Sequence, residues 1–155
     1  MHEERLAELG ITLPGPFPPH DPLDAVVVHR DIARTSGCLP RDQEGKFATG
    51  IVGRDLTPLE AGRCASLCAQ NAVSLLREAL GSLDRIERVL TLTVFVACSD
   101  DFVEQPSVAD GASRVMTDIF GEEAGRHSRS AIGVAALPRG APVEVEVTVA
   151  LKGPR

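Results

Sequence analysis

The sequence contains neither tryptophan nor tyrosine, and its 155 residues include only five phenylalanines. Proteins that bind single-stranded nucleic acids stack the bases on aromatic side chains, and this composition offers too few of them. Positive charge is also scarce, because 16 lysines and arginines stand against 22 aspartates and glutamates and give a formal net charge of −6. Since phosphate backbones are bound by clustered lysine and arginine, we expect no nucleic-acid partner.

Long apolar segments and metal-binding patterns are missing as well. No apolar run approaches the roughly 20 residues of a membrane-spanning helix, and residues 1–5 lack the basic-then-apolar order of a secretory signal. Four cysteines and four histidines occur, without the paired spacings of metal sites. We therefore expect a cytoplasmic protein with free thiols, no membrane contact and no metal.

The remaining composition is that of an ordinary globular protein, with 43% hydrophobic and 25% charged residues, and the length suits one domain. Residues 3–9 predict a short helix that ends at Gly10, and the proline-dense residues 14–22 predict an extended arm on the surface. We therefore divide the chain into residues 1–22, an N-terminal helix and arm, and residues 23–155, a single α+β domain.

The hydrophobic periodicity of this domain predicts the element order β-β-α-β-α-β-β. Two short strands (residues 24–29 and 31–36) precede a helix that Thr57 caps and Gly81 ends. A strand over residues 87–97 is apolar on both faces, so we expect both faces to be covered. Two helices on one face of a mixed sheet would cover one side, and association of chains is the simplest cover for the other.

Residues 129–150 carry the most information about a site. Valines at every second position of the last predicted strand alternate with polar residues, which places Glu144 on the face opposite the valines. A tight turn at Arg139-Gly140 would make a hairpin, in which Arg129 lies roughly 20 Å from Glu144. One small substrate could then contact both side chains only if a bulge shifts the register or if the site lies between subunits.

The same stretch resembles the C-terminal part of a known family. Arg129-Ser130, Leu137-Pro138 and Val143-Glu144-Val145-Glu146 are similar to the closing motif of the Rid/YjgF family, the reactive intermediate deaminases, also described as L-PSP endoribonuclease-like. Thr35-Ser36-Gly37-Cys38-Leu39-Pro40 resembles the family's strand-to-loop segment, and the matches stay collinear over roughly residues 24–151. The resemblance, to a longer and divergent member, implies a chorismate mutase-like fold and a homotrimer with clefts between subunits.

The resemblance also implies roles for individual residues. Arg129 would bind the carboxylate of a substrate, and Glu144 would position or activate the attacking water. The positions that would line the substrate pocket are Ser36, Gly37, Cys38 and Ala131. Cys38 stands where the family usually has glutamine, and Ala131 stands where many members have cysteine, so the sequence departs from the family at two of these positions.

Each of these residues has an alternative interpretation. A single arginine such as Arg129 most often pairs with a neighbouring acid at the surface. Glu144 could be a solvated strand carboxylate, and Glu146 on the same face serves as its internal control. Gly37 could be a plain turn glycine, and the Cys38 thiol could be inert.

Three further polar residues lie near the predicted site. His127 stands two residues before Arg129, and it could act as a general acid, form a pH-sensitive wall of the pocket, or be a solvated loop histidine. Asp110 and Ser113 lie near the helical position where many family members carry asparagine, without matching it. The chain also has no counterpart of the family's usual aromatic residue, often tyrosine, so the shape of the pocket stays open.

We expect hydrolytic deamination of a reactive enamine or imine of the 2-aminoacrylate type to a 2-oxo acid and ammonia, in a cleft between subunits. Such imines hydrolyse unaided, so positioning of water and charge suffices, and the reaction requires neither a metal nor an organic cofactor. The alternative is a non-catalytic protein that binds small carboxylates such as 2-oxo acids, which the missing tyrosine and the departures at Cys38 and Ala131 favour. A specialised deaminase or cyclisation partner in a pathway is a third option.

Overall fold

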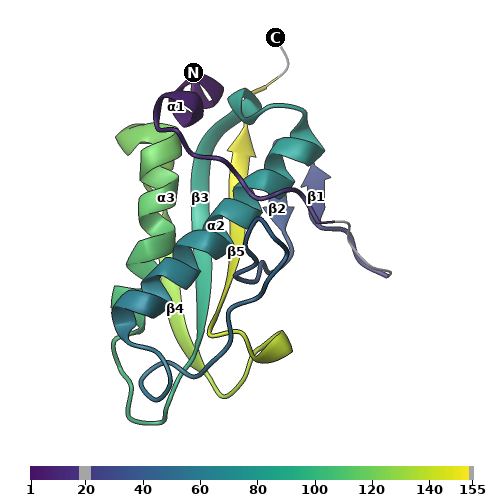
Figure 1. Cartoon of the computed structure of the whole chain (residues 1–155). Coiled ribbons are helices and arrows are strands. Elements are labelled where there is room, and N and C mark those ends of the chain that lie inside the picture. The colour runs from purple at the N-terminus through teal and green to yellow at the C-terminus, as the bar shows by residue number, and fades with distance from the viewer. Residues whose placement is uncertain (18–21, 154–155) are drawn as a thin grey trace.

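A five-stranded mixed sheet carries its helices on one face, as Figure 1 shows. The computed structural model describes residues 1–17 and 22–153. Its elements in chain order are α1 (His2–Glu8), β1 (Val26–His29), β2 (Ile32–Thr35), α2 (Pro58–Leu80), the short 3-10 helix η1 (Leu83–Arg85), β3 (Ile86–Ala97), α3 (Gln105–Gly125), β4 (Ser128–Val134), the 3-10 helix η2 (Pro138–Gly140) and β5 (Val143–Leu151). From β1 onward this is the predicted order of strands and long helices, and the mixed α+β fold is confirmed.

The N-terminal helix α1 forms as predicted and docks against the end of α3. Leu6 is buried, and the ring of His2 meets that of Phe120 edge-on with 5.0 Å between the centroids. Residues 11–17 have no regular structure, and Ser74 Oγ of α2 donates a hydrogen bond to Pro14 O there. The rest of the predicted proline-rich arm includes residues 18–21, which lie outside the described residues.

Local signals in the sequence define α2. Glu60 N donates a hydrogen bond to Thr57 Oγ1 at 3.2 Å, and Thr57 N donates one to the Glu60 carboxylate at 2.8 Å, which completes the predicted capping box. Gly81 ends the helix with a φ of 79°, a left-handed conformation in which a side chain would be strained. None of the described helices combines the length and the apolar character that crossing a bilayer demands.

The predicted hairpin between residues 129 and 150 is wrong. The strand order is β1-β2-β5-β3-β4, so β3 lies between β4 and β5 and separates them. The reason is the connection through α3, because a strand, a helix and a following strand form a crossover unit whose two strands are parallel neighbours. β4 therefore occupies one edge of β3 in parallel, and η2 leads the chain to the other edge, where β5 runs antiparallel.

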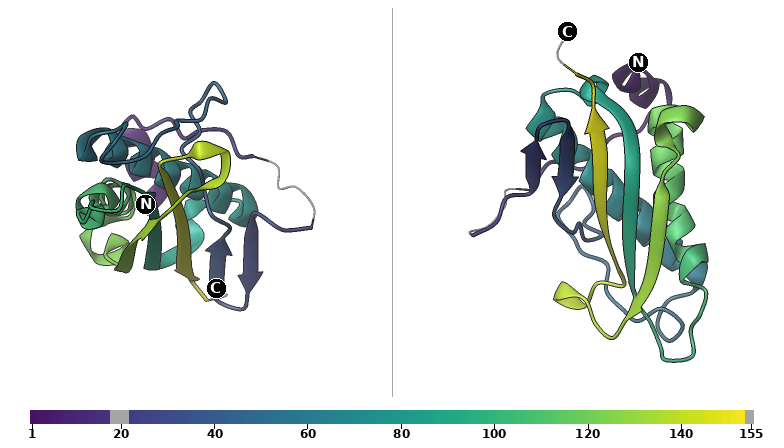
Figure 2. Two further views of the ribbon diagram at one scale, coloured as in Figure 1. Left: turned by 90° about the horizontal axis from the view of Figure 1, so that it is seen from below. Right: turned by 180° about the vertical axis from the view of Figure 1, so that it is seen from behind.

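The sheet has one covered and one open face. Alternate residues of β3 and β5, such as Leu92 and Val145, point towards the helices and are fully buried. The right-hand view of Figure 2 shows the other face without a covering layer. Cross-strand rows on that open face join Ser130 to Thr93 and Glu146, and Ile132 to Phe95 and Glu144. We expect both faces of β3 to be covered, but in a single chain only the face towards the helices is buried.

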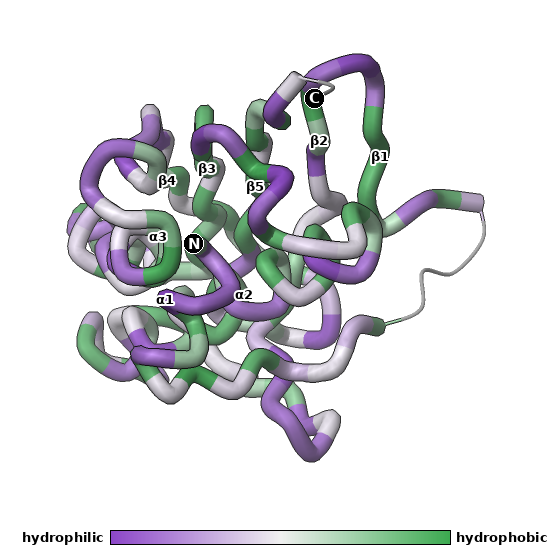
Figure 3. Tube along the Cα trace, turned by 90° about the horizontal axis from the view of Figure 1, so that it is seen from above, coloured by the Kyte–Doolittle hydropathy of each residue, from purple (hydrophilic) through white to green (hydrophobic). Residues whose placement is uncertain are grey.

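The open face extends onto the edge strand β1. Val27 on this face is 57% exposed, and the strand is coloured as hydrophobic along most of its length in Figure 3. Val27 pairs with Arg34 of β2, whose guanidinium binds Glu146 on the open face. The uncovered surface thus combines apolar and charged side chains.

Candidate active site

Glu144 and Gly37 are in contact on the open face. Cys38, the residue after Gly37, forms an isolated bridge with Val145: Cys38 N donates to Val145 O at 2.8 Å, and Val145 N donates to Cys38 O at 3.0 Å. The bridge holds the backbone of Gly37 so close to Glu144 that a Cβ at position 37 would overlap Glu144 Oε1. Only glycine fits there while Glu144 keeps this conformation, which favours the close-approach interpretation of Gly37 over a plain turn.

The backbone of Gly37 can bind a ligand beside that carboxylate. Among the described residues, neither its N–H nor its C=O takes part in a hydrogen bond, and the residue is exposed. Its neighbour Ser36 is already engaged, because Ser36 Oγ donates to Asp24 O at 2.8 Å and Ser36 N donates to Ala25 O at 2.8 Å. Ser36 therefore anchors the loop, while Gly37 presents one donor and one acceptor to the surface.

Glu144 and its internal control Glu146 differ in their surroundings. Glu146 forms an ion pair with Arg34, with 3.0 Å between Glu146 Oε1 and Arg34 Nη2. Glu144 has no ion-pair partner among residues 1–17 and 22–153. Partial burial, and secondly the Glu146 carboxylate, raise the pKa of Glu144 above its ordinary value. A carboxylate with a raised pKa is a stronger proton acceptor, which suits a general base.

Cys38 is not a reactive thiol. The residue is 5% exposed, and burial raises the pKa of Cys38 to about 12, with the nearby Glu144 carboxylate adding to the rise. A thiol with that pKa keeps its proton at neutral pH and is a poor nucleophile. The inert interpretation is therefore favoured. Across the described part of the chain, no three histidine, cysteine or acidic side chains are grouped to hold a metal ion.

Arg129 lies on the helix face, at the edge formed by β4. Its Nη1 donates to Asp110 Oδ1 at 2.9 Å and to Ser113 Oγ at 3.1 Å, and its Nη2 lies 3.4 Å from Pro106 O. Its side chain is only 21% exposed. Ala131 follows two residues later on the same face, half-buried against the core. Arg129 thus has an acid partner, as its alternative interpretation requires, but α3 also holds the guanidinium in a fixed position.

The contacts of Arg129 include residues to which the sequence assigned no definite role. Asp110 and Ser113 stand three positions apart on α3, one helical turn, and so reach the same guanidinium. His127 joins them, with 2.9 Å between His127 Nε2 and Ser113 Oγ. An open hollow of about 520 Å³ lies over this group and is lined by Ser113, Thr117, Glu122, Arg126, His127 and Arg129. The helical spacing was the available signal for the two α3 residues.

Within one chain, Arg129 and Glu144 lie on opposite faces of the sheet. Arg129 is in register with the buried Leu92 of β3, whereas Glu144 is in register with Phe95 on the open face. The side chain of Arg129 contacts α3, and that of Glu144 contacts Gly37, away from the helices. A single site that uses both side chains therefore requires two chains.

Comparison with known proteins gives a consistent result. The family model described as "YjgF/chorismate mutase-like, putative endoribonuclease" matches residues 3–147. The Trypanosoma cruzi protein TCP17 is 45% identical over 146 residues, which are 94% of this chain and 91% of that protein. A protein of unknown function from Agrobacterium tumefaciens has a similar crystal structure, with a TM-score of 0.87 and 40% identity over 97% of this chain and 94% of that one. A "putative endoribonuclease" from Shewanella oneidensis gives a TM-score of 0.91 and 31% identity over 97% and 99% of the two chains.

Proposed function

The chain belongs to the YjgF/chorismate mutase-like family, and from this premise we propose that it deaminates a reactive enamine or imine of the 2-aminoacrylate type. The products are a 2-oxo acid and ammonia. The observation that carries the proposal is the half-buried Glu144 carboxylate, which has a raised pKa and lies against the exposed, unpaired backbone of Gly37. This arrangement places a proton acceptor next to a hydrogen-bond donor, as water addition to an imine requires.

The proposed mechanism uses these groups in two steps. The enamine first takes a proton from water at its methylene carbon, which gives the protonated imine. Arg129 and the N–H of Gly37 hold the substrate carboxylate, and Glu144 takes a proton from the water that attacks the carbon of this protonated imine, which leaves a neutral carbinolamine. Glu144 then returns its proton to the nitrogen, the C–N bond breaks as the C=O bond forms, and the hydroxyl proton passes to the departing ammonia. One protonated imine and one water thus give one 2-oxo acid and one ammonium ion. No cofactor takes part in either step.

We place this site between subunits of a homotrimer. The support is the separation of Arg129 and Glu144 on opposite faces, together with the uncovered sheet face that carries Glu144. Docking the β4 edge of one chain onto the open face of another would bring an Arg129 towards a Glu144. It would also cover apolar surface such as Ile132, which is 42% exposed in the single chain.

The test measures ammonia and 2-oxo acid release from 2-aminoacrylate generated in solution. We expect Glu144→Gln to lower the rate by about 100-fold to 10,000-fold, the usual contribution of a general base. Glu146→Gln is the matched control on the same strand and face, and it should keep most of the activity. Equal activity in both variants and the unmodified protein would remove Glu144 from the mechanism. No acceleration by the unmodified protein would contradict the proposed reaction.

A second candidate is a binding protein for small carboxylates such as 2-oxo acids. The buried Cys38 favours it, because its thiol supplies neither a polar amide nor a nucleophile to the pocket. Saturable binding of pyruvate without turnover of any imine would support this alternative. RNA cleavage, which the descriptions of the family and one relative mention, receives less support from a chain with a net charge of −6 and few aromatic side chains.

A further inference from the structure

Behind Arg129, a chain of hydrogen bonds runs from β4 to α3 and back to the start of β4. Arg129 Nη1 donates to Ser113 Oγ at 3.1 Å, and the same oxygen lies 2.9 Å from His127 Nε2. The other ring nitrogen, His127 Nδ1, lies 2.6 Å from Gly125 O. His127 is thus fixed at both nitrogens and reaches Arg129 through a single hydroxyl group.

Donor and acceptor chemistry assigns a direction to each bond. A carbonyl oxygen can only accept, so the proton of a neutral imidazole is on His127 Nδ1, which donates to Gly125 O. Nε2 is then an acceptor, and it takes the hydroxyl proton of Ser113. The Ser113 oxygen in turn accepts from Arg129. While His127 is neutral, both of its ring nitrogens, the Ser113 hydroxyl and Arg129 Nη1 each have a matching partner in this network.

Protonation of His127 changes this arrangement. The imidazolium carries a proton on both nitrogens, so Nε2 would donate to the Ser113 oxygen that already accepts from Arg129. The Ser113 hydroxyl proton would have to turn away, and two cations would then share one oxygen. Burial, and to a smaller extent the Arg129 charge, lower the pKa of His127, in agreement with a neutral ring.

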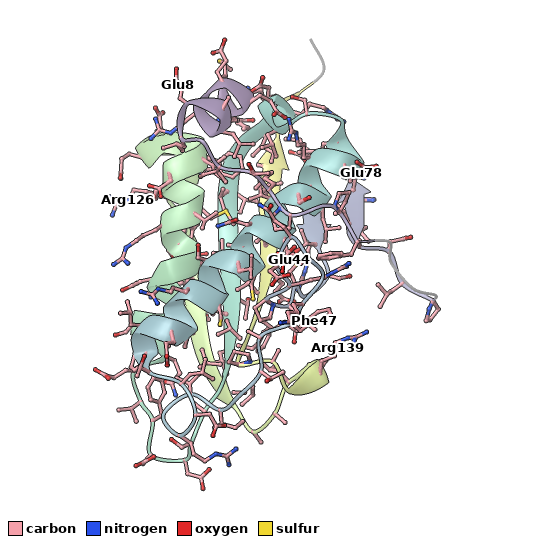
Figure 4. All side chains as sticks on the ribbon, viewed as in Figure 1. Glu8, Glu44, Phe47, Glu78, Arg126 and Arg139 are labelled. Carbon is pink, nitrogen blue, oxygen red and sulfur yellow. The ribbon has the colours of Figure 1, made fainter. Side chains whose placement is uncertain are left out.

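The other charged groups around His127 lie on α3, on β3 and beyond the end of α3. Glu122 and Arg126 line the same hollow, and Arg126, labelled in Figure 4, projects outwards beside α3. Asp110 of α3 binds the far side of the network through Arg129. Arg88 of β3 donates to Arg126 O at 3.4 Å. Within the described residues His127 thus has no hydrogen bond or ion pair to an acidic side chain.

We propose that His127 is a positioning residue that orients Arg129 through Ser113, so that the site binds a small carboxylate more weakly when His127 is protonated. The choice of a small carboxylate as the ligand rests on the proposed function. The positioning of Arg129 by His127 rests only on the three hydrogen bonds, which do not depend on any substrate.

The first experiment therefore uses no ligand. Nitrogen-15 NMR of the imidazole should show the Nδ1–H tautomer for His127 in the neutral protein, and the guanidinium N–H signals of Arg129 should exchange slowly with water. Ser113→Ala should speed that exchange, whereas Ser107→Ala, an exposed serine on the same helix, should leave it unchanged. An Nε2–H tautomer, or no change in Ser113→Ala, would overturn the proposed positioning.

The second experiment follows pyruvate binding by calorimetry from about pH 8 to about pH 5, the range in which histidine titrates. We expect the Kd of the unmodified protein to rise about tenfold across this range, a typical coupling between two sites. His127→Gln, which stays neutral, should show a Kd that does not change with pH across this range. Retention of the full pH dependence in His127→Gln would contradict the proposal.

The two experiments separate failure of the inference from failure of the proposed function. If pyruvate does not bind at any pH, the proposed ligand class is wrong, while the tautomer and the Arg129 exchange rates still decide whether His127 positions Arg129. If His127→Gln unfolds, the Ser113→Ala and Ser107→Ala pair carries the same comparison, with its pH profile as the readout. If His127 had a purely structural role, His127→Gln would lower the melting temperature and would leave the pH dependence of pyruvate binding unchanged.

Discussion

Position 37 requires glycine because there is no space for a side chain. Its backbone conformation is one that other residues adopt, since its φ lies outside the left-handed region, so strain is not the reason for glycine. The reason is the Glu144 carboxylate, which occupies the space where a side chain at position 37 would begin. The bridge between Cys38 and Val145 places Gly37 and Glu144, which are distant in sequence, side by side, and their roles at a site stay predictions.

We predict that Gly37→Ala lowers deaminase activity by about 100-fold, because the new methyl group must displace the Glu144 carboxylate, and a misplaced catalytic group costs about that much. Stability should change little, since Gly37 is exposed and the half-buried Glu144 side chain can turn towards solvent. Turnover and thermal unfolding of the same preparation check both parts. Gly15→Ala, where a Cβ has no neighbour within 4 Å, is the control. Full activity of Gly37→Ala would show that the contact has no role in catalysis.

Among the elements, α2 and α3 show how closely two helices can pack when both carry glycine. A Cβ on Gly111 of α3 would overlap the carbonyl oxygen of Gly62 on α2, whereas a Cβ on Gly62 would have only Val108 O nearby, at 3.9 Å. The two glycines face each other, but only one of them is needed for the close approach. The position of α3, and with it of Asp110 and Ser113, depends on this contact.

We predict that glycine-to-alanine substitutions at the two facing positions have opposite effects on the stability of the fold. Gly111→Ala should destabilise the fold by about 1–3 kcal/mol, because the helices must separate. Gly62→Ala should stabilise it by about 0.5–1 kcal/mol, since alanine is the better helix former and the space is available. Urea unfolding of both variants measures the difference. Equal changes in the two midpoints would mean that the helices do not touch at Gly111.

Elements defined by local signals were predictable, and elements defined by distant pairing were not. Thr57, Glu60 and Gly81 fix the ends of α2 through contacts within a few residues, so the sequence alone located that helix. The partner of β4 is chosen by the crossover through α3, and nothing within residues 128–151 carries that information. The hairpin was therefore predicted wrongly, and with it the distance from Arg129 to Glu144 within one chain.

On the scale of the whole molecule, the uncovered sheet face is the main unexplained surface of a single chain. It combines exposed apolar side chains, among them Val27 and Ile132, with the Glu144 and Gly37 pair. Cross-strand neighbours join Ile132 to Glu144 through Phe95, so the proposed subunit contact and the proposed catalytic carboxylate share one row of residues.

We predict that Ile132→Lys dissociates the proposed trimer, because it places a charge in the middle of the contact. Leu59→Lys is the matched control, since Leu59 is 69% exposed on the helical side of the molecule, away from that face. Light scattering coupled to size-exclusion chromatography gives the mass of each variant. A trimer in both variants, or in neither, would place the contact elsewhere.

We also predict that stability falls as the pH is lowered through the titration of His127. Burial lowers the pKa of His127 in the folded chain, so the unfolded chain binds more protons as the pH falls below about 6.5. This contribution is fully present above the unfolded pKa and is lost as the pH falls through the folded pKa. Melting temperatures of the unmodified protein and His127→Gln should therefore differ in slope below about pH 6.5. His2, whose pKa burial also lowers, is present in both proteins and cancels in the comparison.

The placement of Arg129 and Glu144 on opposite faces of one sheet has a genetic consequence. On the proposed assembly, each complete site takes its arginine from one chain and its glutamate from another. A chain defective at Arg129 and a chain defective at Glu144 would each be inactive alone, yet mixed trimers of the two would contain some intact sites. Two damaged copies of the gene in one cell could thus complement each other, and one damaged copy would impair the sites of its healthy neighbours.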